Sequence, residues 1–209
     1  MVRGARVRVK PGQDAIYYLT ADGWNAARNS PQLEALKAAG VEVLLMHERI
    51  DEWMAGYLTE YQGKPLRNVA KGEVPDNLVD GADTAKADAA GEGAAVVERL
   101  KALLGDRVTD VRVSRRLTES ASCLVLEEHD MALHMQRLLR AAGQEVPAAR
   151  PVLEVNPAHP LLARLQGETD EARAADLALV VLEQAQLAEG VPLEDPSGFL
   201  KRVNALLAG

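Results

Sequence analysis

Apolar residues near the end of the chain recur with helical spacing and predict two consecutive helices. Between Asp170 and Glu189 they wrap almost all the way around the helix, whereas a helix that packs only on its own domain needs a single apolar stripe. Asp195 then has the character of an N-cap, with Pro196 at the first position of a second, amphipathic helix. Because two antiparallel helices cannot bury this much apolar surface, we expect the same pair from a second copy to complete a four-helix bundle. The predicted dimer interface comprises Leu177, Val180, Val181, Gln184, Leu187, Phe199, Leu200, Val203, Leu206 and Leu207.

The pattern in the first third of the chain predicts a compact α/β unit. Residues 15–19 (AIYYL) and 41–46 (VEVLLM) have the aromatic and β-branched content of strands. Between them, a helix is expected to begin at a Ser-Pro pair and to end at Gly40. A strand, a helix and a strand in this order form a right-handed crossover, which favours parallel pairing of the two strands. A further helix is predicted over residues 50–58.

The composition changes between Lys71 and Gly93, where Ala, Gly and Asp replace nearly all large apolar residues. Such a stretch is typical of a linker or hinge, so we place the domain boundary there. After it, the pattern predicts a helix that ends at Gly105. The other elements predicted in this part are strands over residues 108–115 and 122–126, expected to be neighbours, a helix over 130–142 and a strand over 150–155.

These elements predict two small units of different architecture. Residues 1–70 would form a three-layer α/β/α unit, and residues 71–93 would link it to the rest of the chain. Residues 94–209 would form an α+β unit that ends in the helical pair and dimerises through it. A chain of 209 residues with 47% hydrophobic composition is long enough for two small aliphatic cores.

Charge and cysteine content narrow the classes of partner. The formal net charge of −7 argues against a nucleic-acid surface, which needs clustered Lys and Arg. No apolar run approaches the roughly 20 residues that span a bilayer, and no signal-peptide core follows the basic start. The single cysteine, Cys123, lies in an apolar run and is expected to be a small buried core residue. Together these features predict a cytoplasmic protein with no membrane or nucleic-acid partner.

Two groups of apolar residues allow two interpretations each. Met131, Met135 and Leu139 share one face of the predicted 130–142 helix, and this face could simply cover the neighbouring sheet. Methionine also repacks readily against different shapes, so the same face could bind varied partners. Likewise, the group around Trp53 and Tyr57 could face a core or supply exposed aromatic anchors for binding.

A resemblance to a known family runs through the chain from about Lys10 to Leu207. It is carried, in the family's order and spacing, by the segments IYYLTADGWNAARNSPQLEALKAAGVEVLLMHERIDEWMAGYLTEYQGKPL, RLKALLGDRVTDVRVSRRLTESASCLV, AAGQEVPAARPVLEVNPAHPLL and LEDPSGFLKRVNALL. These segments resemble the C-terminal part of the bacterial heat shock protein 90 chaperones, the HtpG family.

The resemblance implies that residues up to about Val69 are the last α/β subdomain of the family's middle domain, and that residues from about Asp83 are its C-terminal dimerisation domain. It also implies a homodimer whose cleft holds unfolded or partly folded client proteins. The family binds ATP and magnesium in an N-terminal domain that these segments do not match, so we expect no cofactor, no catalytic residue and no enzyme activity in this chain. The client-binding residues implied by the resemblance are Glu52, Trp53, Met54, Tyr57, Met131, Met135, Leu138 and Leu139.

The sequence contains no phosphate-binding loop, no nucleophile motif and no histidine spacing typical of a metal site, so no metal is expected. Two alternatives to a client-binding dimer stay open. The chain could be a small α/β enzyme or ligand-binding protein that uses the crevice at the strand ends of residues 15–46. It could also be a pure dimerisation scaffold that contacts no client.

Overall fold

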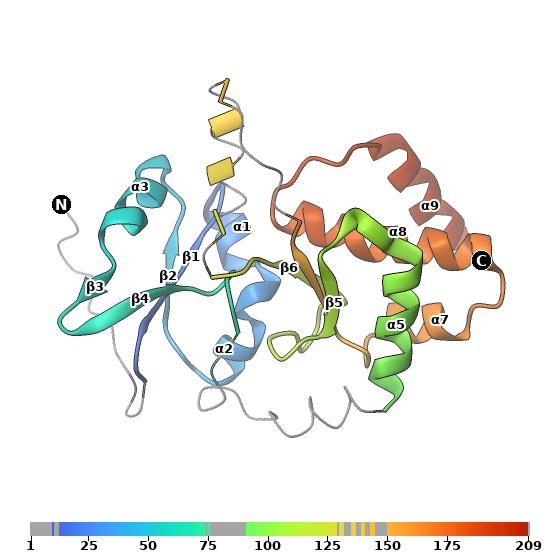
Figure 1. Ribbon diagram of the computed structural model, residues 1–209, viewed down its shortest axis with the longest axis horizontal. Coiled ribbons are helices and arrows are strands. Elements are labelled where there is room, and N and C mark those ends of the chain that lie inside the picture. The colour runs from blue at the N-terminus through green and yellow to red at the C-terminus, as the bar shows by residue number, and fades with distance from the viewer. Residues whose placement is uncertain are drawn as a thin grey trace.

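The computed structural model describes residues 10, 13–73, 75, 91–128, 130–131, 135–136, 139–140, 143–144 and 150–208. Two sheets lie side by side along the long axis of the molecule, and the C-terminal helices lie beyond the second sheet (Figure 1). The predicted mixture of α/β and α+β architecture is confirmed by this arrangement.

The first sheet has four strands in the order β2-β1-β4-β3. Its central strand β1 (Ile16–Thr20) is parallel to β2 (Val43–Met46), as the predicted crossover requires, and to β4 (Lys64–Asn68). The short strand β3 (Glu60–Tyr61) pairs antiparallel with β4. The β3–β4 hairpin was not expected from the sequence, because Pro65 interrupts the strand pattern of β4.

The helices of this unit lie between its strands in sequence. They are α1 (Trp24–Arg28), a 3-10 turn η1 (Pro31–Leu33), α2 (Glu34–Ala38) and α3 (Arg49–Tyr57). The predicted 30–40 helix is present, and the Ser30 side chain caps its first turn by accepting a hydrogen bond from the Gln32 amide (3.2 Å). Gly40 ends it with a positive φ of 63°. In Figure 1, α3 lies on one side of the sheet and α1 and α2 lie on the other.

The second sheet has the order β5-β7-β6. Strand β7 (Val152–Val155) is parallel to β5 (Asp110–Val113) and antiparallel to β6 (Ser122–Val125). The expectation that the strands now seen as β5 and β6 are neighbours is therefore wrong. Strand β7 pairs with β5 at the position that β6 was expected to take, and the buried Glu154 of β7 lies in register with Arg112 of β5 and forms an ion pair with it (2.9 Å).

The helices of the second unit whose bounds the structure describes are α5 (Glu92–Leu104), α7 (Pro160–Gly167), α8 (Glu171–Ala188) and α9 (Pro196–Ala208). A 3-10 turn η2 (Gly105–Arg107) follows α5. The predicted cap of the last helix is present, since Asp195 accepts a hydrogen bond from the amide of Gly198. The structure also shows a cap that was not predicted, because Asp170 at the start of α8 accepts from the amides of Ala172 and Arg173. Of the predicted 130–142 helix, residues 135–136 and 139–140 are described and are helical.

Arg116, in the loop between β5 and β6, joins the two units. Its side chain is only 1% exposed. Its Nε donates a hydrogen bond to Oε2 of Glu154 in the second unit (2.8 Å). Its Nη1 donates to Oε1 of Gln32 (3.0 Å) and to the carbonyl of Val69, both in the first unit, and its Nη2 donates to the carbonyl of Gly72 (2.6 Å). One buried guanidinium thus binds backbone and side-chain oxygens from both units.

Two further groups of the first unit bind the second. The fully buried Gln32 donates through Nε2 to the carbonyl of Leu124 in β6 (2.6 Å) and to Oε1 of Glu189 at the end of α8 (2.9 Å). The Glu34 carboxylate accepts from the amides of the loop before β6, at 2.6 Å from Thr118 and 2.7 Å from Glu119, and the Ser120 amide and hydroxyl also donate to it. Burial by itself raises the pKa of Glu34, but these hydrogen bonds outweigh it and lower the pKa overall.

The start of the predicted 71–93 linker is paired rather than free. The Gly72 amide donates to the Leu126 carbonyl (2.9 Å), and the Leu126 amide donates to the Ala70 carbonyl (3.2 Å). Lys71 forms a parallel bridge with Leu126, so the chain leaving β4 extends the edge of the second sheet at β6. Residues 74 and 76–90 of the predicted linker lie outside the described residues.

The Glu34 contacts predict a pH dependence of folding stability. Because the pKa of Glu34 is lower in the folded chain, its contribution is present above the unfolded-state pKa and is lost as the pH falls through the folded-state pKa. We expect Glu34→Gln to lower the free energy of unfolding at pH 7 by about 1 kcal/mol, allowing for its partial exposure, and by less at pH 4. Urea unfolding at both pH values measures this. Glu60→Gln, on the exposed strand β3, is the control, and an equal loss for Glu34→Gln at both pH values would contradict the assignment.

Candidate functional site

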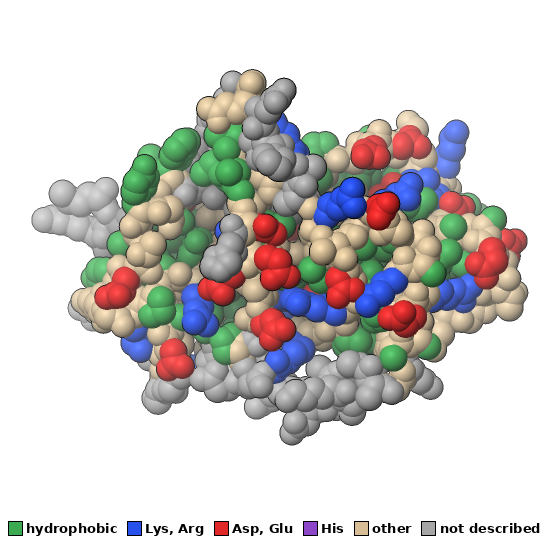
Figure 2. All heavy atoms as spheres, in the orientation of Figure 1, with side chains coloured by type: hydrophobic (Ala, Val, Ile, Leu, Met, Phe, Trp, Pro, Cys, Tyr) green, Lys and Arg blue, Asp and Glu red, His purple; other side chains and the backbone are tan. Residues whose placement is uncertain are grey.

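Helix α3 exposes a continuous apolar stripe. Ile50, Trp53 and Tyr57 are 68%, 52% and 86% exposed, and their spacing of three and four residues places them on one face of the helix. A capping box of Glu48 and Asp51 fixes the start of α3, with the Glu48 amide donating to the Asp51 carboxylate at 2.9 Å. Large apolar side chains gather over this helix in Figure 2. Of the two interpretations of this helix, the core-facing one is therefore excluded for Trp53 and Tyr57.

The segment that follows β6 exposes a second apolar group. Met131 is 41% exposed, and Met135 and Leu139 are half-buried. The buried Gln136 donates through Nε2 to the Met131 carbonyl (2.7 Å), and Lys71 donates through Nζ to the carbonyl of Asp130, so the start of the segment is held against the end of β4. Of the predicted client-binding residues, Leu138 and the Glu52 side chain lie outside the described part of the chain, and Met54 is half-buried on α3.

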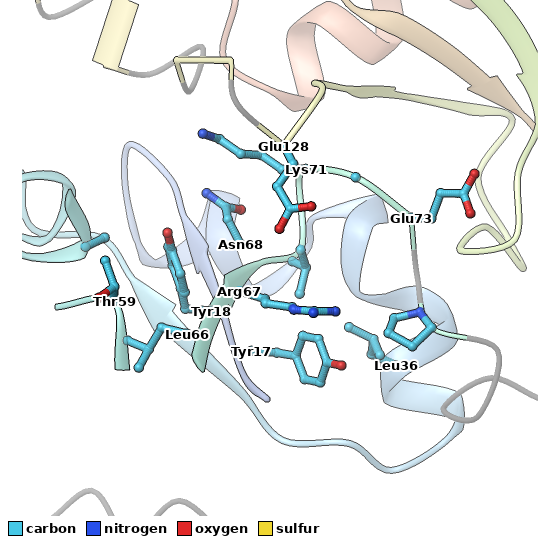
Figure 3. A pocket seen from close by; sticks show the side chains of 14 residues that line it. Tyr17, Tyr18, Leu36, Thr59, Leu66, Arg67, Asn68, Lys71, Glu73 and Glu128 are labelled. Atoms are coloured by element: carbon cyan, nitrogen blue, oxygen red, sulfur yellow. The ribbon is translucent and has the colours of Figure 1, made fainter. Parts of the chain in front are cut away.

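A hollow of about 230 Å³ lies between these two apolar groups (Figure 3). The end of α3 forms one wall with Ala55 and Thr59, and Glu128, three residues before Met131, forms the other. Strands β1 and β4 form its floor. The other residues that line it are Tyr17, Tyr18, Leu36, Leu66, Arg67, Asn68, Val69, Lys71, Gly72, Glu73 and Pro75. The structure thus places the end of α3 and Glu128, which precedes the Met131 segment, on two walls of one pocket.

Sequence reasoning did not identify the residues inside the pocket. Arg67 and Tyr17 come from strands that pair in parallel, with Tyr17 opposite Arg67 in the register, although 50 residues separate them in sequence. Burial raises the pKa of Tyr17, and the nearby Arg67 guanidinium partly offsets that increase. No local motif marks these residues, because β4 itself was not predicted.

The crevice where an α/β unit of this kind would bind a small ligand is filled by the second unit. In parallel sheets that crevice lies beyond the carboxyl ends of the strands, between β1 and β4 here. The Arg116 guanidinium occupies the end of β4 through its bond to the Val69 carbonyl. Beyond β1, a hollow of about 60 Å³ remains between Thr20 and Gly190, well below the 300 Å³ or more of typical ligand pockets.

A metal site, a membrane-spanning helix and a reactive thiol find little support among the described residues. Within them, no group of three or more His, Cys, Asp or Glu side chains is placed to hold a metal ion. Nor is any helix in the described ranges both long and apolar enough to cross a bilayer. Cys123 is fully buried, as predicted, and burial raises its thiol pKa well above the ordinary value, which disfavours the reactive thiolate.

The structure divides the predicted dimer interface into two sets. Leu177 and Val181 are fully buried and Val180 nearly so, because α8 packs against β6, α5 and α7 of its own chain. Gln184 also bonds within the chain, donating to the Ser122 hydroxyl (3.3 Å). Leu177, Val180 and Val181 are therefore core residues, and they correct the expectation that α8 needs a second copy to bury its apolar surface.

The remaining predicted residues keep exposed apolar surface. Leu200 and Leu207 on α9 are 59% and 81% exposed, and Leu187 at the end of α8 is half-exposed. Phe199, Val203 and Leu206 are half-buried, and none of the described residues of α9 is fully buried. Arg202 holds α9 on α8 through a shielded ion pair with Glu183 (2.5 Å), which sequence reasoning missed because 19 residues separate the partners.

Comparison with known proteins places the chain among the heat-shock chaperones. A family model described as "Hsp90 protein" matches residues 6–209. The chain is 51% identical over 202 residues to "Chaperone protein HtpG" of Chromobacterium violaceum, 48% over 203 residues to that of Methylococcus capsulatus and 50% over 202 residues to that of Dechloromonas aromatica. These matches cover 96% of this chain and 31–32% of each relative, so the chain spans about a third of their length.

The exposure of the α3 stripe predicts that its side chains contribute little to folding. We expect Trp53→Ala and Tyr57→Ser each to change the free energy of unfolding by no more than about 0.5 kcal/mol. Leu36→Ala, in the buried core of the same unit, should lower the free energy of unfolding by about 2–5 kcal/mol. Urea unfolding of the three variants measures this, and a loss above about 2 kcal/mol for either aromatic variant would show that the stripe is part of a core.

Proposed function

The chain belongs to the Hsp90 protein family, and on that basis we propose that it pairs with a second copy of itself and holds partly unfolded client proteins. The observation that carries the client-binding part is the exposed apolar surface of the α3 stripe and of Met131, together with the half-buried Met135 and Leu139. Contiguous exposed apolar groups of this kind mark interaction sites on proteins. We call these apolar groups, together with the half-buried Met54 of α3, the client surface.

The side chains of the client surface suit varied and irregular partners. Trp53 and Tyr57 supply large rigid rings at a low cost in conformational entropy. Met131 and Met135 supply flexible thioethers that fit differently shaped apolar groups. Binding would gain about 25 cal/mol for each Å² of apolar surface buried, from which the entropy lost on association is subtracted. Weak and reversible holding is the expected outcome.

Pairing with a second copy is supported by the apolar face left on α9. Leu200 and Leu207 lie seven residues apart, which is two helical turns, and so project from the same side of the helix. Leu187, Phe199, Val203 and Leu206 complete the proposed face. The same face on a second copy would be self-complementary about a two-fold axis and would form the family's four-helix bundle from two α8–α9 pairs. A dimer would then present two client surfaces to one chain and raise its apparent affinity.

We expect client holding to depend on the client surface. The triple variant Trp53→Ala, Tyr57→Ser and Met131→Ser should need several times more protein than wild type to suppress the aggregation of a heat-unfolded enzyme, because each substitution removes apolar contact area. Light scattering measures this, with Arg107→Gln, an exposed substitution on η2, as the control. Equal suppression by wild type and the triple variant would contradict client binding here and would favour a pure dimerisation scaffold.

We expect dimerisation to depend on α9. Sedimentation velocity of Leu200→Ser with Leu207→Ser should show a monomer at concentrations where wild type is a dimer, since both side chains would be buried in the bundle. Ile50→Ser is the matched control, because Ile50 is equally exposed and apolar but lies on α3, and this variant should remain a dimer. A double variant that sediments as wild type does would contradict the proposed face.

A further inference from the structure

The pocket between the end of α3 and Glu128 holds a cation that makes no hydrogen bond or ion pair within the described part of the chain. Arg67 lines the pocket from β4 and is exposed. We propose that Arg67 makes the client surface select segments in which a single carboxylate follows a large apolar side chain. This inference rests on the proposed client binding, and it names the chemistry of the segments that are bound.

The other basic side chains near the pocket are engaged elsewhere. Lys71 donates to the Asp130 carbonyl, and Lys64 at the start of β4 donates through Nζ to the Gln13 carbonyl (2.8 Å). Arg67 lies opposite Tyr17 in the parallel register, and Figure 3 shows its guanidinium extended over the pocket beside the Tyr17 ring. A guanidinium that has no ion-pair partner among the described residues presents a fork of N–H donors, which matches the two oxygens of a carboxylate.

The rest of the pocket fits an apolar side chain next to that carboxylate. Leu36, Leu66, Val69 and the Tyr17 ring give it an apolar lining. Its volume of about 230 Å³ is below the usual 300–1,000 Å³ of cofactor and drug-sized ligand pockets, so it suits one or two side chains of a peptide better than a small-molecule ligand.

Two acidic residues on the pocket wall limit the number of carboxylates that can bind. Glu73 and Glu128 both line it, and Glu128 lies across the pocket from the α3 wall (Figure 3). A second carboxylate on the bound segment would approach one of these like charges, which is unfavourable. The preferred segment therefore carries one acidic residue beside a Leu or Phe, with neutral residues around it.

The test uses two labelled peptides that differ in one group. Both are twelve residues long, with a central Leu-Phe-Asp or Leu-Phe-Asn sequence flanked by Gly and Ser, and their binding to the full chain is measured by fluorescence anisotropy. We expect wild type to bind the Asp peptide about three- to tenfold more tightly at low salt, and the preference to shrink in 0.5 M NaCl. Arg67→Gln should bind both peptides equally, and Arg67→Lys should keep part of the preference.

The controls separate this inference from the proposed function. Arg28→Gln removes an exposed arginine from α1, which does not line the pocket, and should keep the full preference. If wild type binds both peptides equally, or if Arg67→Gln keeps the preference, the proposed role of Arg67 is wrong. Client holding is then decided by the aggregation assay alone. If wild type binds neither peptide and also fails to suppress aggregation, the proposed client surface itself is wrong.

Discussion

The arrangement of this chain depends on the buried ion pair between Arg116 and Glu154. Both side chains are almost fully shielded from water, so each charge needs the other and the hydrogen bonds around it. Removing one partner of such a pair typically costs about 3–5 kcal/mol, because the other charge stays buried without compensation. The pair also requires β7 to lie beside β5, since Arg112 reaches Glu154 from β5 and Arg116 reaches it from the following loop. The same guanidinium then binds Gln32 and Val69, which holds the first unit against the second.

The hydrogen bonds of Arg116 to both units explain why the pocket lies between the units and beside α3. The chain leaves β4 at Val69, passes the Arg116 guanidinium and pairs with Leu126 at the end of β6. Glu128 and Met131 follow directly, so the apolar segment begins where the first unit's sheet ends. The pocket therefore has an α3 wall from one unit and a Glu128 wall from the other. The pocket therefore depends on how the two units are joined, whereas α9 packs on α8 and does not line the pocket.

Local signals in the sequence predicted the elements that depend on local rules. Ser30 and Asp195 act as caps, Gly40 ends its helix, and Cys123 is a core residue, as their neighbours in sequence indicated. Interactions between distant residues were not predictable in this way. Strand β7 lies beside β5, where the buried Glu154 pairs with arginines about 40 residues earlier in the chain. The burial of Leu177 and Val181 follows from packing on β6 and α5 rather than on a second copy. The pocket was not predicted either. Pro65 interrupts the strand pattern of β4, and no sequence motif connects Arg67 with Tyr17, which lies opposite it in the sheet.

The central claim is that unfolded proteins bind at the client surface, and the methionines allow a direct measurement. The chain has five, of which Met54, Met131 and Met135 belong to this surface and Met46 is buried in β2. Methyl NMR of the chain labelled at its methionines, recorded while an unfolded protein is added, reports each position separately. The account predicts that the signals of Met54, Met131 and Met135 shift or broaden while that of Met46 does not change. Binding that leaves the first three signals unchanged would show that clients are held elsewhere and would contradict the account.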